Sequence, residues 1–128
     1  MSTQEINIIS LAYLGDAVYE LHIREFLLRK GIAKVDDLMK ASVSYVSAKN
    51  QCRILTNLMN DQFLTKEEIS IVNRGRNYKR ASHPKNTDII TYKLSTGFEA
   101  LIGFLYLENK SRLTEILNYI MEEKEWKK

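Results

Sequence analysis

The sequence predicts a single all-α domain of about six to eight helices. Apolar residues recur at steps of three and four along most of the chain, whereas few stretches alternate apolar and polar residues as a half-buried strand would. Proline occurs once, at Pro84, so long helices can form on either side of it. We expect one domain over residues 1–128, because two separate cores would each be too small to be stable.

The first half of the chain is expected to fold as helices joined by short connections. A first helix is predicted over residues 2–12, and a second begins near Gly15 and is stopped by Gly31. One mostly apolar side of this second helix is expected to carry Leu14, Val18, Leu21, Glu25 and Leu28. The aspartates at 36–37 can cap a short third helix. Residues 45–59 then show helical spacing over about four turns.

The second half continues in the same way, with one interruption. Thr65 and Glu68 have the spacing of a capping box, so a helix begins there. Residues 73–86, NRGRNYKRASHPKN, are the least helical part of the chain. A long helix is expected over residues 88–107, and a last helix that starts at Ser111 is expected to bury Leu113, Leu117 and Ile120.

The charge distribution indicates an anionic partner. The formal net charge is only +3, but five basic residues and no acidic one lie between residues 69 and 87: Arg74, Arg76, Lys79, Arg80 and Lys85. The rest of the chain has 14 basic and 16 acidic residues. A nearly neutral body with one basic segment suggests that an anionic partner binds at that segment. A solvated loop is the alternative, and on charge alone it is the commoner case.

The remaining composition indicates a protein of the reducing cytoplasm. Cys52 is the only cysteine, so neither an intrachain disulfide nor a cysteine-based zinc site can form. The first ten residues, MSTQEINIIS, lack the basic start and apolar run of a secretory signal. No apolar stretch reaches the length that a membrane span needs.

Two acidic residues stand in apolar surroundings. Asp16 follows Gly15 in LAYLGDAVYE, residues 11–20, at the expected start of a helix, where it can serve as an N-cap. Glu99 is the single acid of STGFEALIGFLYL, residues 95–107. A charged residue is rare in such a run unless it is paired, so Glu99 either reaches solvent or has a basic partner.

A third possibility joins these two acids. Small residues in the second string allow another helix to approach closely, namely Gly97, Ala100 and Gly103. If Asp16 and Glu99 then face each other, they repel unless a proton or a cation lies between them. Mg²⁺ is a suitable cation, since it binds through one or two carboxylates and keeps several waters.

The two strings resemble the signature and the second conserved element of the ribonuclease III catalytic domain. Further strings occur in the order typical of the Mini-ribonuclease III subfamily, which has this domain and no separate double-stranded RNA-binding domain: YVSAKNQ, NRGRNYK, PKNTD and TYKLSTGFEALIG. The resemblance extends over nearly the whole chain. It implies a Mg²⁺-dependent endoribonuclease that cuts double-stranded RNA and leaves 5′-phosphates and 3′-hydroxyls.

The resemblance also assigns residues to the catalytic site. Asp16 and Glu99 match the two metal-binding acids, and Mg²⁺ is the implied cofactor. Ribonuclease III has two further acids, at positions that are Ala12 and Thr96 here. Mini-ribonuclease III is similar to this chain in lacking both.

The resemblance further implies the partners of the chain. RNA contacts are expected from the basic segment and one neighbouring helix, at Arg74, Arg76, Asn77, Lys79, Arg80, Lys85 and, more weakly, Lys49. A homodimer would place two sites across the minor groove, with Tyr13, Val18 and Phe26 either at the dimer surface or in the core. His22 is expected to be structural, and His83 to contact RNA. The implied role is maturation of the large-subunit (23S) ribosomal RNA precursor.

Two other functions fit the residues less well. One is a helical dimer that binds structured RNA without cutting it, with the two acids as caps or ion pairs. The other is a helical interaction protein that binds no RNA. Retention of both Asp16 and Glu99 argues against the first, and the basic segment argues against the second.

Overall fold

The all-α prediction is confirmed by the structure, a computed structural model that describes residues 2–79 and 88–126, with side chains described as far as Glu122. These residues form one short 3-10 helix and six α-helices. In chain order they are η1 (Thr3–Glu5), α1 (Ile8–Arg29), α2 (Val35–Val46), α3 (Ala48–Asn60), α4 (Lys66–Arg76), α5 (Ile89–Glu108) and α6 (Lys110–Trp126).

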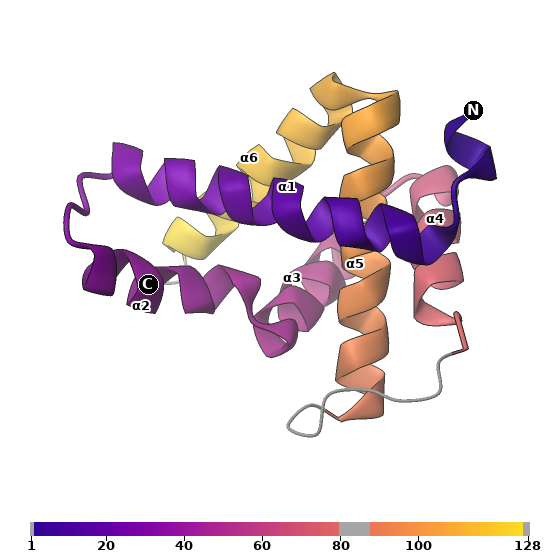
Figure 1. Ribbon diagram of the computed structural model, residues 1–128, viewed down its shortest axis with the longest axis horizontal. Coiled ribbons are helices and arrows are strands. Elements are labelled where there is room, and N and C mark those ends of the chain that lie inside the picture. Colours follow the sequence, from indigo (N-terminus) through magenta and orange to yellow (C-terminus); the bar gives the residue numbers. More distant parts are fainter. Residues whose placement is uncertain (1, 80–87, 127–128) are drawn as a thin grey trace.

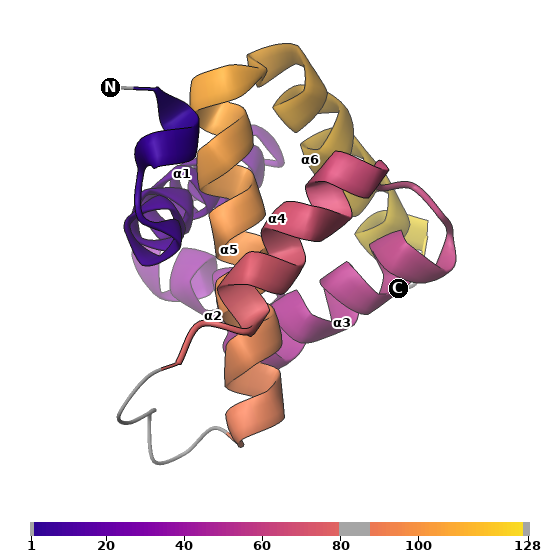
Figure 2. The same cartoon turned by 90° about the vertical axis from the view of Figure 1, so that its right-hand side faces the viewer.

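Helix α5 is the centre of the fold. It contacts α1, α3, α4 and α6, and Figures 1 and 2 show α1 crossing it on one side and α4 on another. Its buried residues run almost without a break over 95–105, with Glu99 the exception. A helix that is apolar on every side is stable only when neighbours surround it, which accounts for its place in the core.

The first two predicted helices are one continuous helix. Asn7 caps α1 by accepting a hydrogen bond from the Ile9 N–H, and the helix continues through Gly15 and Asp16 to Arg29. The predicted break at Gly15 is therefore wrong, and Asp16 is not an N-cap. The predicted end is confirmed, since Gly31 follows α1 with a φ of 94°, a conformation that glycine adopts without strain.

The helix predicted over residues 45–59 is divided in two. Ser47 has an extended backbone, and its hydroxyl accepts a hydrogen bond from the Asn50 N–H, so it ends α2 and caps α3. The third helix is consequently longer than predicted, because α2 runs from Val35 to Val46. Ser47 interrupts the helix although the apolar spacing continues across it, and spacing alone does not reveal such a break.

The later helices begin near the predicted positions. Thr65 and Glu68 form the complete capping box at the start of α4, and Asp88 caps α5 by accepting from the Thr91 N–H. Helix α6 starts one residue earlier than expected and buries Leu113, Leu117 and Ile120 as predicted. Arg112 joins its start to α4, with its Nε 2.8 Å and its Nη2 2.9 Å from the two carboxylate oxygens of Glu68. This bidentate pair fixes α6 against α4.

Candidate active site

Asp16 and Glu99 meet where α1 crosses α5. Asp16 lies in α1 and is exposed, whereas Glu99 lies in α5 and is half-buried. Their carboxyl groups are close enough to share a hydrogen bond. The structure thus brings together the two acids that were predicted as a pair.

The close approach of the two helices depends on glycine. A Cβ atom added to Gly15 would lie 1.8 Å from the Glu99 carbonyl oxygen, and one added to Gly103 would lie 2.0 Å from the Leu11 carbonyl oxygen. Both distances are far shorter than a van der Waals contact, so the backbones meet where neither helix has a side chain. Two short acidic side chains can then touch across the crossing.

Burial and neighbouring acidic side chains both raise the pKa of Glu99. Burial is the largest effect that raises the pKa of its carboxyl, to about 8, and the hydrogen bond and charge of Asp16 add to it. The charge of Glu20, one turn after Asp16 in α1, acts in the same direction, while the Gln51 amide opposes it. Glu99 therefore holds a proton at neutral pH unless a cation replaces that proton.

The donor set at this site fits a small divalent cation. Among the residues that the structure describes, no group of three or more His, Cys, Asp and Glu side chains is placed to hold a metal. At the positions of the two further family acids, Ala12 is buried and the Thr96 hydroxyl donates to the Tyr92 carbonyl oxygen. Asp16 and Glu99 remain, and two carboxylates completed by waters suit Mg²⁺.

Two contributors to the site were not predicted. Glu20 could have been found from its spacing, because four residues after Asp16 a helical side chain lies on the same face. Gln51 gave a weaker signal, a polar residue within an apolar stripe of α3. Gln51 is almost fully buried, and its Nε2 lies 3.5 Å from Glu99 Oε2.

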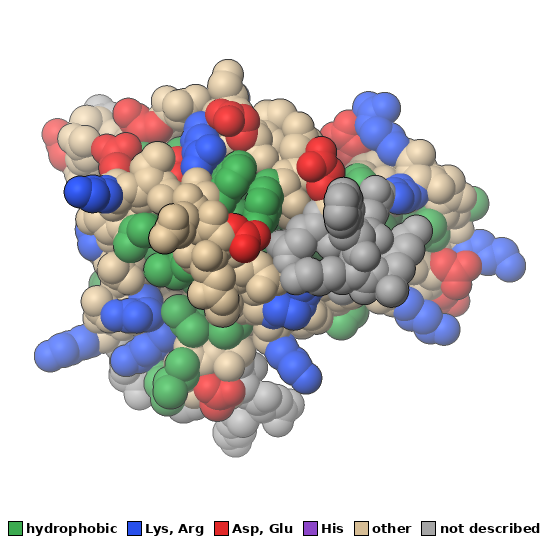
Figure 3. Space-filling model, turned by 180° about the vertical axis from the view of Figure 1, so that it is seen from behind, with side chains coloured by type: hydrophobic (Ala, Val, Ile, Leu, Met, Phe, Trp, Pro, Cys, Tyr) green, Lys and Arg blue, Asp and Glu red, His purple; other side chains and the backbone are tan. Residues whose placement is uncertain are grey.

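The basic segment begins at the end of α4. Arg74, Arg76, Asn77 and Lys79 are all exposed, as is Lys49 on α3. Figure 3 shows Lys and Arg side chains gathered near the end of α4, at the lower left of that view. Three residues predicted to contact RNA lie outside the described residues: Arg80, His83 and Lys85.

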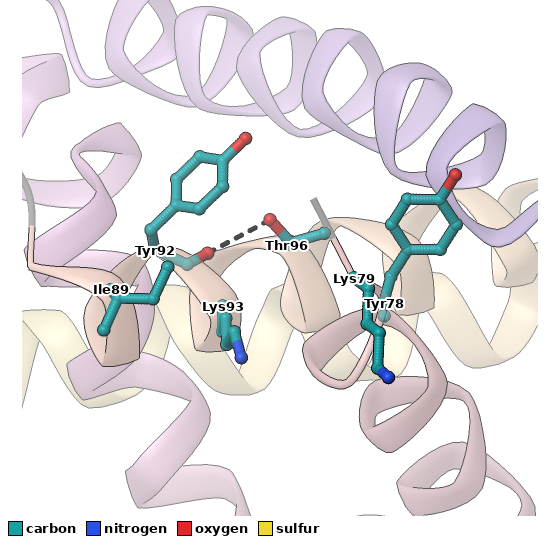
Figure 4. A pocket seen from close by; sticks show the side chains of 7 residues that line it. Tyr78, Lys79, Ile89, Tyr92, Lys93 and Thr96 are labelled. Carbon is teal, nitrogen blue, oxygen red and sulfur yellow. Dashed lines mark hydrogen bonds between the residues drawn. The ribbon is translucent and has the colours of Figure 1, made fainter. Parts of the chain in front are cut away.

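A pocket of about 260 Å³ lies beside this basic segment, between the end of α4 and the start of α5. Figure 4 shows the amino groups of Lys79 and Lys93 on one side of it and the rings of Tyr78 and Tyr92 on the other. Thr96, one turn before Glu99, also lines the pocket. Cationic and aromatic groups together suit a nucleotide strand, whose phosphates and bases they can contact.

The three residues expected either at the dimer surface or in the core differ in their burial. Tyr13 is 84% exposed, whereas Val18 is only 7% exposed and belongs to the core. Phe26 is half-buried and packs edge-on against Tyr45. Two leucines on the mostly apolar side predicted for this helix, Leu21 and Leu28, are exposed. His22 is half-buried and lines a hollow between α1 and α6, away from Glu99.

Comparison with known proteins identifies the family. The sequence model described as the ribonuclease III domain matches residues 9–110. The chain belongs to the ribonuclease III family. It is thus an endoribonuclease, a hydrolase of the type that acts on double-stranded RNA.

Curated relatives place the chain in the Mini-ribonuclease III subfamily. Mini-ribonuclease 3 of Streptococcus pneumoniae is 42% identical over 94% of this chain and 94% of its own length. The protein of the same name from Brevibacillus brevis is 49% identical over 87% of this chain and 82% of its own length. Mini-ribonuclease 3 of Staphylococcus aureus is 44% identical over 91% of this chain and 87% of its own length.

A solved structure confirms the fold. The crystal structure of a Fusobacterium nucleatum protein superposes with a TM-score of 0.81 at 32% identity, and the match covers 94% of this chain and 95% of that one. Among the described residues of this ribonuclease III-family chain, no helix is long and apolar enough to cross a membrane.

Proposed function

We propose that this chain is a Mg²⁺-dependent endoribonuclease that matures the ends of the large-subunit (23S) ribosomal RNA precursor in the cytoplasm. The observation that carries the proposal is the meeting of Asp16 and Glu99 at the crossing of α1 and α5. Two carboxyls held together in a partly buried site, with a third acid nearby, favour a divalent cation. The choice of ribosomal RNA rests on the subfamily resemblance.

The two acids would hold the cation in the proposed reaction. Asp16 and Glu99 would bind it through carboxylate oxygens, and Glu99 would release its proton on binding. A Mg²⁺ ion held there would supply charge neutralisation for a phosphodiester and activation of a water. Hydrolysis then breaks the bond from phosphorus to the 3′ oxygen, so the products carry a 5′-phosphate and a 3′-hydroxyl.

The basic segment is the proposed site of RNA binding. Double-stranded RNA is recognised mostly by shape, through phosphates and 2′-hydroxyls, so cationic side chains are the groups that bind it. Those proposed are Arg74, Arg76, Lys79, Arg80 and Lys85, with Asn77 as a neutral hydrogen-bonding partner and Lys49 as a weaker contact.

A homodimer completes the proposal, because one active site cuts one strand of a duplex. Helix α1 presents a stripe of exposed apolar residues at Tyr13, Leu21 and Leu28. Exposed large apolar residues in a row are typical of an interface. Helix α2 carries a second such stripe, Val35, Met39 and Val43, beside Leu28.

The test is a cleavage assay on a perfect RNA duplex and on a 23S precursor fragment. Each substrate is incubated with Mg²⁺, with EDTA, and with the Glu99→Gln variant. We expect discrete double-strand cuts that disappear with EDTA and fall by at least about 100-fold in the variant, since a ligand to the catalytic metal is lost. Asp16→Asn should behave in the same way.

Circular dichroism and RNA binding serve as controls for both variants. Folded variants that bind RNA and do not cut it support a catalytic role for the two acids. Cutting that survives both substitutions would refute it, and binding by the unchanged protein without cutting would favour the non-catalytic RNA-binding dimer. Cutting of the plain duplex at the same rate as the precursor would contradict a preference for the ribosomal substrate.

A further inference from the structure

A buried amide lies directly behind Glu99. Gln51 of α3 is 1% exposed, and its side chain makes three hydrogen bonds. Its Oε1 accepts from Ser95 Oγ at 2.7 Å, while its Nε2 donates to the Val46 carbonyl oxygen at 3.2 Å and to Glu99 Oε2 at 3.5 Å. Its polar atoms thus have partners on α2 and α5, as a buried amide requires.

These partners permit one orientation of the amide. With the oxygen and nitrogen exchanged, Gln51 would place its Oε1 against the Val46 carbonyl oxygen, which can only accept a hydrogen bond. The Ser95 hydroxyl is itself buried and lies one turn before Glu99 on α5. The helix that carries the acid therefore also carries the group that directs the amide toward it.

Core packing does not require an amide at this position. The neighbouring buried residues of α3 are apolar, namely Ile54, Leu55 and Leu58. Leucine or methionine would fill a similar volume without the cost of removing an amide from water. The amide does provide a donor for Glu99, whereas the charges of Asp16 and Glu20 both disfavour its ionised form.

We propose that Gln51 is a positioning residue, whose amide, oriented by Ser95, holds the Glu99 carboxylate in the rotamer that binds a divalent cation opposite Asp16. The inference rests on the metal site proposed above. A Glu side chain has several rotamers, and a hydrogen bond that selects one of them before the cation arrives lowers the entropic cost of binding. Substitution of such supporting groups typically weakens metal binding by about 10- to 100-fold.

The test is the affinity of the RNA-free protein for Mn²⁺, used as the probe cation and measured by titration calorimetry. We expect Gln51→Met, which keeps the length of the side chain, to bind Mn²⁺ at least about tenfold more weakly. Ser95→Ala leaves the amide in place without its orienting bond and should give a smaller loss. The matched control is Asn50→Ala, which removes the adjacent amide of α3, a donor to the Val43 carbonyl and Ser47 Oγ, and should bind Mn²⁺ normally.

Cleavage at varied Mg²⁺ gives a second readout. Gln51→Met should need more Mg²⁺ but approach the rate of the unchanged enzyme at saturation, because both ligands remain. Thermal melting separates this role from a structural one: a lower melting temperature with unchanged Mn²⁺ affinity would overturn the inference. If Gln51→Met does not fold, unchanged affinity in Ser95→Ala would overturn it instead. Mn²⁺ binding that does not depend on Glu99 would overturn both the proposed metal site and the role of Gln51. Normal Mn²⁺ binding by Gln51→Met would overturn only the role of Gln51.

Discussion

Glu99 holds a proton that a metal ion would have to displace on binding, so the proposed metal site links metal affinity to pH. In the metal-free protein the pKa of its carboxyl is raised to about 8 by burial and by Asp16, whereas in the unfolded chain it has its ordinary value of 4.5. The folded state therefore binds more protons than the unfolded state between these two values. The contribution of this carboxyl to the free energy of unfolding is fully present at low pH and is lost as pH rises through about 8.

We accordingly predict that the melting temperature in EDTA falls between pH 6 and pH 8.5, and that Mg²⁺ removes much of this fall because it binds the ionised form. Affinity for Mg²⁺ should rise by up to about tenfold per pH unit below the pKa, since one proton leaves for each ion bound. Melting curves and metal titrations at several pH values measure both effects. Glu99→Gln cannot ionise and is the control; equal pH slopes for it and the unchanged protein would contradict the prediction.

At the scale of the helices, the crossing of α1 and α5 determines whether a site exists. Gly103→Ala would place a Cβ 2.0 Å from the Leu11 carbonyl oxygen and 3.0 Å from the Gly15 nitrogen. Both neighbours are backbone atoms, so the helices must separate. We predict a loss of roughly 1–3 kcal/mol in the free energy of unfolding, typical of overpacking, and a fall in cleavage greater than the loss of folded protein explains.

Chemical denaturation with a parallel cleavage assay would measure the two losses. Ser10→Ala provides the control, because Ser10 is exposed on α1 and the substitution adds helix propensity without touching α5. A Gly103→Ala variant as stable and as active as the control would mean that the crossing can widen without effect on the acids.

The same crossing accounts for what can and cannot be predicted from the sequence. Asp16 and Glu99 can be predicted because an acidic residue is rare in an apolar run unless it has a partner. The glycines of α5 further indicate that another helix approaches closely. The helix break predicted at Gly15 is wrong. A glycine in the sequence can mark a helix boundary or a close contact with another helix, and the residues around Gly15 do not distinguish the two. Gln51 escapes prediction because its partners, Ser95 and Glu99, lie 44 and 48 residues away in the chain and meet it only in the fold.

At the scale of the whole molecule, we expect the charge near the end of α4 to govern how an RNA duplex is bound. With cleavage disabled by Glu99→Gln, affinity for an RNA duplex should fall with salt at a log–log slope of about −3 to −4, if roughly four phosphates are bound. Substitution of Arg74 or Arg76 by Gln should make the slope shallower by about one for each phosphate that the variant no longer binds. Fluorescence anisotropy at several salt concentrations measures the slope. Lys66→Gln, at the opposite end of α4, is the control, and a slope near zero would refute the role of the segment.

The apolar stripe on α1 leads to the last prediction, on assembly. Tyr13 and Leu21 are 84% and 66% exposed, and both lie on the helix that carries Asp16. A charge placed there would be buried without a partner in a dimer but would be harmless in a monomer. Leu21→Glu should therefore give a folded monomer in sedimentation equilibrium, with double-strand cutting reduced and single-strand nicks becoming the main product. Ile90→Glu, at the start of α5, makes an equal change in charge at an exposed residue outside this stripe and should leave the dimer intact. A Leu21→Glu protein that still sediments as a dimer would place the interface elsewhere, with the stripe on α2 as the next surface to substitute.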